Sequence, residues 1–184
     1  MTMNSYVHNQ DHINPDSKDL IDHRVVSIAA PSLALFDSIK EVCTGLDSLS
    51  IPYKVSIVAA HRAPKKTLRY IDGLEKNGIE VVIACGSGSA HLPGLIASLT
   101  TIPVIGIPLE SNFLGGIDSL ASIVQMPKGV PVATVGMGSS YNAAILACQI
   151  LSLKYPFLKH KMKTHKDKLE RTVETEDNNV NDQY

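Results

Sequence analysis

Five short runs of apolar, largely β-branched residues recur through the middle of the chain, and this repetition constrains the fold more than any other feature. The runs are Val25–Ala30, Val55–Val58, Val81–Ala84, Val104–Ile107 and Val132–Val135. They are apolar almost throughout rather than alternating with polar residues, which is typical of strands covered on both faces. The sequence therefore predicts a parallel sheet with helices on either side.

Longer stretches with helical periodicity separate these runs. They are Leu35–Leu49, Lys65–Lys76, Leu95–Leu99, Ile117–Val124 and Ala143–Leu153. Strands that alternate with helices and are joined by right-handed crossovers form an α/β fold, here a three-layer αβα sandwich around a central parallel sheet.

Composition divides the chain into four zones. Residues 1–23 are polar and are expected to form a flexible extension, while residues 24–155 carry the α/β domain. A basic and then acidic stretch with spaced apolar positions predicts a C-terminal helix over residues 156–177. Residues 178–184 are expected to form a frayed tail.

Charge, hydropathy and cysteine content exclude several classes of protein. The 184 residues include 17 Lys and Arg against 18 Asp and Glu, without the basic excess of a nucleic-acid binder. No apolar run reaches the roughly 18 residues of a membrane span, and the polar N-terminal segment does not resemble a secretory signal. Cys43, Cys85 and Cys148 are dispersed and are expected to be buried thiols in a reducing compartment. We expect a cytoplasmic protein that binds neither membranes nor nucleic acid.

The segments that follow the predicted strands are where an open α/β sheet binds its ligand. After the second strand, His61 stands beside Arg62. An imidazole exchanges protons near neutral pH, and a guanidinium fork matches a phosphate or carboxylate. Taken alone, this pair is equally consistent with a surface His-Arg pair at the start of a helix.

A small, flexible segment, Gly86–Gly94, follows the third strand. Its glycines would let backbone N–H groups approach a ligand, but it has neither the lysine of a Walker loop nor GxGxxG spacing. A tight strand-to-helix turn is the simpler interpretation of this segment alone. Asp118, followed by Ser119, is interpreted as a helix cap. Cysteines and histidines do not cluster at metal-binding spacing, so no metal is expected.

Several segments, in this order and spacing, resemble the PurE family. They are Ala60-His61-Arg62, Ala90-His91-Leu92-Pro93-Gly94, Ile105-Gly106-Ile107-Pro108, Gly116-Ile117-Asp118-Ser119-Leu120, the run from Ser122 through Gln125-Met126-Pro127 to Val132, and Asn142-Ala143-Ala144. The resemblance covers residues 25–155, and the Ser-Ile-Val-Gln-Met-Pro run is its most specific part.

The family comprises N5-carboxyaminoimidazole ribonucleotide mutases and related aminoimidazole ribonucleotide carboxylases of purine biosynthesis. The resemblance implies a flavodoxin-like fold and a homo-octamer in which the C-terminal helix packs on a neighbouring subunit. It implies no metal or organic cofactor. It also implies a nucleotide substrate whose carboxylate moves from the exocyclic nitrogen to C4 through bound CO2, which makes the protein an isomerase.

The resemblance also implies roles for individual residues. His61 would be the catalytic proton shuttle, Arg62 would hold the phosphate, and the loop around His91 would close over the base. The implied substrate-binding residues are Ser32, Arg62, Ser87, Gly88, His91 and Ser111.

The segment after the first strand departs from the family pattern Met-Gly-Ser-x-Ser-Asp. Here it reads Ala30-Pro31-Ser32-Leu33-Ala34-Leu35, so that only Ser32 is kept. Ala34 and Leu35 replace a serine and an aspartate that bind phosphate and ribose in the family. Two alternatives therefore stay open: a PurE-like paralogue that carboxylates or decarboxylates another heterocycle, and a non-catalytic oligomeric binding protein.

Overall fold

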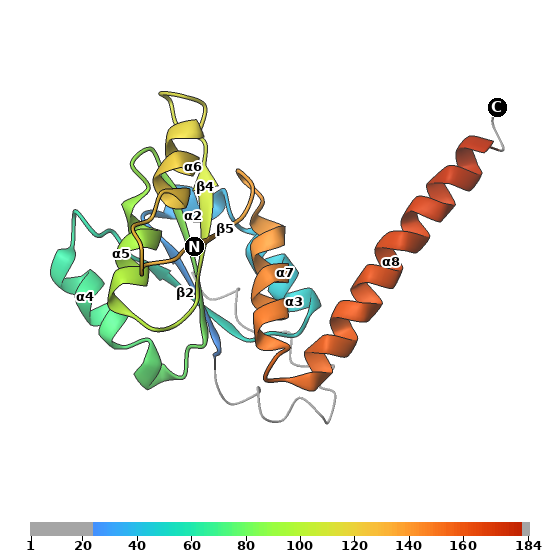
Figure 1. The fold of residues 1–184 in the computed structure, drawn as a ribbon, viewed down its shortest axis with the longest axis horizontal. Coiled ribbons are helices and arrows are strands. Elements are labelled where there is room, and N and C mark those ends of the chain that lie inside the picture. The colour runs from blue at the N-terminus through green and yellow to red at the C-terminus, as the bar shows by residue number, and fades with distance from the viewer. Residues whose placement is uncertain (1–23, 182–184) are drawn as a thin grey trace, which may run out of the picture.

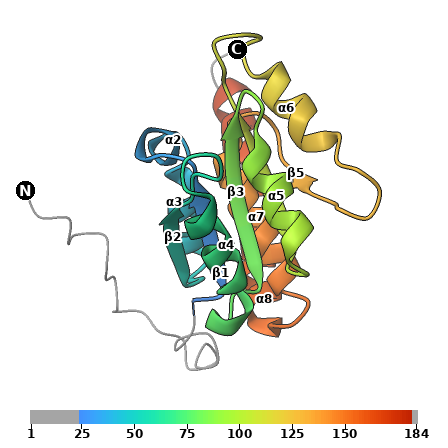
Figure 2. The same cartoon turned by 90° about the vertical axis from the view of Figure 1, so that its left-hand side faces the viewer.

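The structure, a computed structural model, describes residues 24–181 and contains one parallel sheet (Figures 1 and 2). Its strands are β1 (Val26–Ala30), β2 (Tyr53–Ile57), β3 (Val81–Ser87), β4 (Val104–Leu109) and β5 (Ala133–Thr134). Their order across the sheet is β2-β1-β3-β4-β5, and every neighbouring pair is parallel. The predicted parallel sheet is confirmed.

The helices connect the strands in the predicted alternation. They are α2 (Leu33–Asp37), α3 (Glu41–Ser48), α4 (Pro64–Asp72), α5 (His91–Leu99), α6 (Ile117–Val124), α7 (Ser140–Leu151) and α8 (Pro156–Asn181), with a short 3₁₀ helix at Glu75–Asn77.

Two apolar cores, one on each face of the sheet, make the three layers. In β1, Ile28 packs into the core shared with α3, α7 and the start of α8, whereas its neighbour Ala29 packs into the core under α4 and α5. This division follows from the alternation of side chains along a strand. Helix α6 lies on the same side as α5, because its Ile123 packs close to Gly106 of β4. The predicted αβα sandwich is therefore confirmed (Figure 1).

The expectation of one helix over Leu35–Leu49 is wrong, because the chain forms α2 and α3 with a tight turn between them. Ser38 Oγ donates to the Ala34 carbonyl at 3.3 Å, and that carbonyl is the acceptor a continuing helix would need. The next backbone bonds, from Ile39 to Phe36 and from Val42 to Ile39, span three residues and tighten the turn. Ile39, which lies in this turn, is fully buried in the core.

Helix α8 starts in the core and then leaves the body of the protein (Figure 1). Leu158 and Met162 are buried, and Lys161 Nζ donates to the Leu49 carbonyl at 2.9 Å. Almost all later side chains are exposed, and the helix continues to Asn181, beyond its predicted end at residue 177. The expected extension over residues 1–23 and the last residues of the expected tail, 182–184, lie outside the described residues.

The described cysteines agree in part with the prediction. Cys85 and Cys148 are buried, and burial raises the pKa of these thiols to about 12 and about 11. They are therefore neutral at physiological pH. Cys43 is only half-buried. Within residues 24–181, no helix has the length and apolar character required to span a membrane.

Candidate functional site

The sheet has a point where successive connections leave on opposite faces. After β1 the chain passes to α3 on one face, whereas after β3 it passes to α5 on the other face. Because β1 and β3 are neighbours, their connections diverge at the carboxyl ends of the strands, which is the position where α/β proteins of this kind bind ligands in a crevice. Ser32 follows β1 at this edge, and Gly88 and His91 follow β3.

His61 and Arg62 lie at the same edge, between the end of β2 and the start of α4, and both side chains are exposed. Arg62 Nη2 donates to the Pro31 carbonyl at 2.7 Å, which joins this segment to the loop after β1. Ser32 in that loop is the N-cap of α2, and its hydroxyl accepts from the Leu35 N–H at 3.3 Å. The structure therefore brings Ser32, His61 and Arg62 into one half of the site.

The turn after β3 depends on glycine. A Cβ on Gly86 would lie 2.7 Å from Ala90 Cα, and Gly88 has a φ of +64°. Ala90 is also in the left-handed region, at φ 39°, and it precedes His91, the exposed first residue of α5. The turn thus brings the β3 strand and the α5 helix close together, as the tight-turn interpretation required.

Hydrogen bonds hold the β3 turn against the loop after β4 and against α6. The Gly88 N–H donates to Ser119 Oγ at 2.7 Å, and Ser87 Oγ donates to the Glu110 carbonyl at 2.7 Å. Ser111 Oγ donates to Asp118 Oδ1 at 2.6 Å. Ser87 and Ser111, two of the expected substrate-binding residues, therefore have hydrogen-bond partners within the protein. Each hydroxyl oxygen keeps the capacity to accept a hydrogen bond.

The two halves of the site are held separately. Across residues 24–181, no side-chain hydrogen bond joins the Ser32, His61 and Arg62 half to the Ser87, Gly88, His91 and Ser111 half. The pairing of β1 with β3 and the packing of α2 against β3 connect them. A ligand bound at the carboxyl ends of β1 and β3 would contact both halves.

Asp118 is not the helix cap that the sequence suggested. The N-cap of α6 is Gly116, at φ 100°, and Asp118 lies in the first turn, where it accepts from Ser111. Ser119 was missed as a part of the site. The only sequence signal was its place in the Gly116–Leu120 segment, because its partner Gly88 lies 31 residues away.

Ser119→Ala tests the support that this buried hydroxyl gives to the β3 turn. Ser119 is fully buried, so the alanine variant leaves the Gly88 N–H without its acceptor, at a cost of about 1 to 3 kcal/mol. We expect a lower free energy of unfolding in urea and faster hydrogen exchange at the Gly88 amide. Ser98→Ala is the matched control, because its exposed hydroxyl bonds only within α5, and should change stability by less than about 0.5 kcal/mol. An unchanged rate of hydrogen exchange at the Gly88 amide would contradict the proposed support of the turn by Ser119.

The arrangement offers acid-base chemistry on an anionic ligand. An imidazole is a side chain able to accept and donate a proton, a guanidinium is able to pair with an anion, and a glycine turn is able to present backbone N–H groups to a ligand. No group of three or more His, Cys, Asp or Glu side chains in residues 24–181 is arranged to hold a metal ion.

Known proteins resemble this chain in sequence and in fold. The AIR carboxylase family model matches residues 25–172. N5-carboxyaminoimidazole ribonucleotide mutase of Pyrococcus horikoshii is 50% identical over 135 residues, which cover 73% of this chain and 76% of the relative. The mutase of Bacillus subtilis is 44% identical over 151 residues, covering 81% and 93%. The crystal structure of Treponema denticola PurE superposes with a TM-score of 0.77 at 23% identity, covering 83% and 96%, and supports the flavodoxin-like fold. The chain belongs to the AIR carboxylase family.

Proposed function

We propose that this protein is an N5-carboxyaminoimidazole ribonucleotide mutase of purine biosynthesis. The observation that carries the proposal is the presence of His61 and Arg62 at the ligand-binding edge of a chain that is 50% identical to a mutase of that name. The connections of β1 and β3 diverge at this edge, and the hydrogen bond from Arg62 to Pro31 holds the histidine segment beside the loop after β1.

In the proposed reaction the N–CO2 bond breaks and a C–C bond forms, with one proton moved by His61. The imidazolium of His61 protonates the exocyclic nitrogen as CO2 departs. C4 of the imidazole then attacks the bound CO2, and the neutral His61 removes the proton from C4. The exposed position of His61 leaves its nitrogens free to reach both atoms.

The other site residues would orient the nucleotide. Arg62 would hold the phosphate with the N–H groups that Pro31 does not use, and Ser32 would add its hydroxyl. The loop around His91, with Ser87, Gly88 and Ser111, would cover the base. CO2 must stay bound during the reaction, so a closed pocket that excludes water is needed.

A homo-octamer in the cytoplasm is the assembly that we propose for this function. The distal half of α8 supports it, because Leu169, Val173 and Val180 are exposed along a helix that leaves its own domain. A neighbouring subunit would cover these apolar side chains.

The altered loop after β1 favours a second candidate, a paralogue that carboxylates or decarboxylates a different heterocycle. Leu35 packs against the apolar core, and neither it nor Ala34 offers a side-chain acceptor to a sugar hydroxyl. A less ribose-dependent substrate would not need those acceptors.

The test is an activity assay of the assembled protein with N5-carboxyaminoimidazole ribonucleotide, with aminoimidazole ribonucleotide plus bicarbonate in parallel. Turnover of the first substrate is the expected result. Turnover of the second alone would instead assign the carboxylase reaction with free CO2. No turnover of either, with binding of another carboxylated heterocycle, would favour the paralogue.

A further inference from the structure

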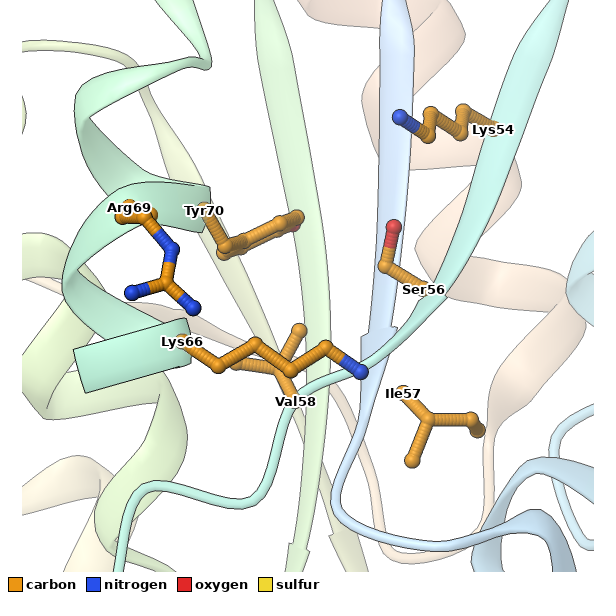
Figure 3. A pocket seen from close by; sticks show the side chains of 7 residues that line it. All are labelled: Lys54, Ser56, Ile57, Val58, Lys66, Arg69 and Tyr70. Atoms are coloured by element: carbon orange, nitrogen blue, oxygen red, sulfur yellow. The ribbon is translucent and has the colours of Figure 1, made fainter. Parts of the chain in front are cut away.

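An open hollow of about 320 Å³ lies beside the edge strand β2, between this strand and α4 (Figure 3). Its lining residues come from β2, the residue that follows it, and α4: Lys54, Ser56, Ile57, Val58, Lys66, Arg69 and Tyr70. The volume is at the lower end of the range of about 300 to 1,000 Å³ that small-molecule sites occupy.

The sheet register accounts for the composition of this hollow. Lys54 pairs with Ser27 and Ser56 pairs with Ala29, so both side chains share the face of the sheet that α4 covers. Because β2 is the edge strand, this face is only partly covered, and it stays open to solvent.

Three cationic groups turn towards the space between the two walls: Lys54 from the strand, and Lys66 and Arg69 from one face of the helix (Figure 3). The lining residues include no carboxylate. Among the residues that the structure describes, none forms an ion pair or a side-chain hydrogen bond with these three groups. Three like charges around one hollow repel each other, and an anion bound between them would offset this electrostatic repulsion.

Hydroxyl groups and an apolar side chain complete the lining. Tyr70 Oη and Ser27 Oγ lie 2.8 Å apart in a hydrogen bond, and burial raises the pKa of Tyr70 to about 12, so its hydroxyl stays neutral. Ser56 adds a second hydroxyl and Val58 an apolar surface. The neutral tyrosine leaves the positive charge of the three cations uncompensated.

We propose that this hollow binds a small molecule that carries a diphosphate group. Three separated cations match an anion with more than one phosphoryl group, because each phosphoryl group can pair with its own donor. The proposal goes beyond the proposed mutase function, because Lys54 and Ser56 lie within β2 whereas His61 and Arg62 follow its end.

Calorimetric titration of the full chain with inorganic pyrophosphate tests the proposal. We expect saturable binding that weakens as the salt concentration rises, and weaker binding of inorganic phosphate. Lys54→Gln and Arg69→Gln should each weaken pyrophosphate binding by about tenfold, as expected for the loss of one charge-assisted contact. Lys65→Gln is the matched control, because this neighbouring exposed lysine of α4 does not line the hollow; its effect should stay within about twofold.

Three results would overturn the proposal. The first is the absence of pyrophosphate binding to the unaltered protein. The second is binding that Arg62→Gln abolishes but the Lys54 and Arg69 variants retain, since the anion would then occupy the catalytic edge. The third is a change in native mass caused by the Lys54 and Arg69 variants, which would assign this face to contact with a second copy. These measurements need no turnover, so a failure of the mutase assay does not affect them.

Discussion

His61→Asn is expected to lower kcat for the carboxylate transfer by about a hundredfold to ten-thousandfold, the range that one general acid-base group supplies. Asparagine keeps a hydrogen-bonding side chain of similar reach but cannot exchange protons near neutral pH. His61 is exposed and makes no hydrogen bond or ion pair with another described residue, so its loss should leave folding unchanged. The measurement is steady-state kinetics with N5-carboxyaminoimidazole ribonucleotide, beside thermal unfolding and native mass.

Two further variants separate proton transfer from binding. His91→Asn should act mainly on KM, because the proposal gives His91 a role in covering the base rather than in moving the proton. His160→Asn is the matched control on the exposed surface of α8, outside the candidate site, and should leave both constants unchanged. A His61→Asn variant that keeps its turnover would remove the proton-shuttle role.

The sequence pattern predicted the buried parts of the fold well and the edges less well. The interior strands β1, β3 and β4 begin within one residue of their predicted starts, because burial on both faces makes their residues uniformly apolar. Strand β2 begins two residues before the predicted Val55, at Tyr53. It is an edge strand with exposed positions, so an apolar run does not mark its beginning.

The helix break and the connections within the site could not be predicted for a different reason. The turn before α3 is made by the Ser38 hydroxyl and two short backbone hydrogen bonds, and residues 37–41 contain neither glycine nor proline to mark it. The Arg62–Pro31 and Gly88–Ser119 bonds join residues 31 apart, and they exist only once the strands stand in order. Periodicity therefore indicated which edge of the sheet carries the candidate site, but not which groups hold its loops.

Leu158→Ala is expected to lower the free energy of unfolding by about 2 to 5 kcal/mol, because it removes a fully buried side chain and leaves a cavity. Leu158 lies in the core shared by α3 and α7, at the start of α8. Its loss should loosen the attachment of α8, which the Lys161 bond to the Leu49 carbonyl also supports. Urea unfolding of wild type and variant measures the difference.

Leu169→Ala is the matched substitution on the same helix, and it separates attachment of α8 from its proposed role in assembly. Leu169 is 49% exposed, so truncating it should change the stability of one subunit by less than about 0.5 kcal/mol. If a neighbouring subunit covers this part of α8, the same variant should shift the native mass towards smaller species. Leu158→Ala would then act on folding and Leu169→Ala on assembly. A Leu169→Ala variant with unchanged native mass and unchanged resistance to dissociation on dilution would contradict a subunit contact at this position, and the exposed apolar residues of α8 would need another partner.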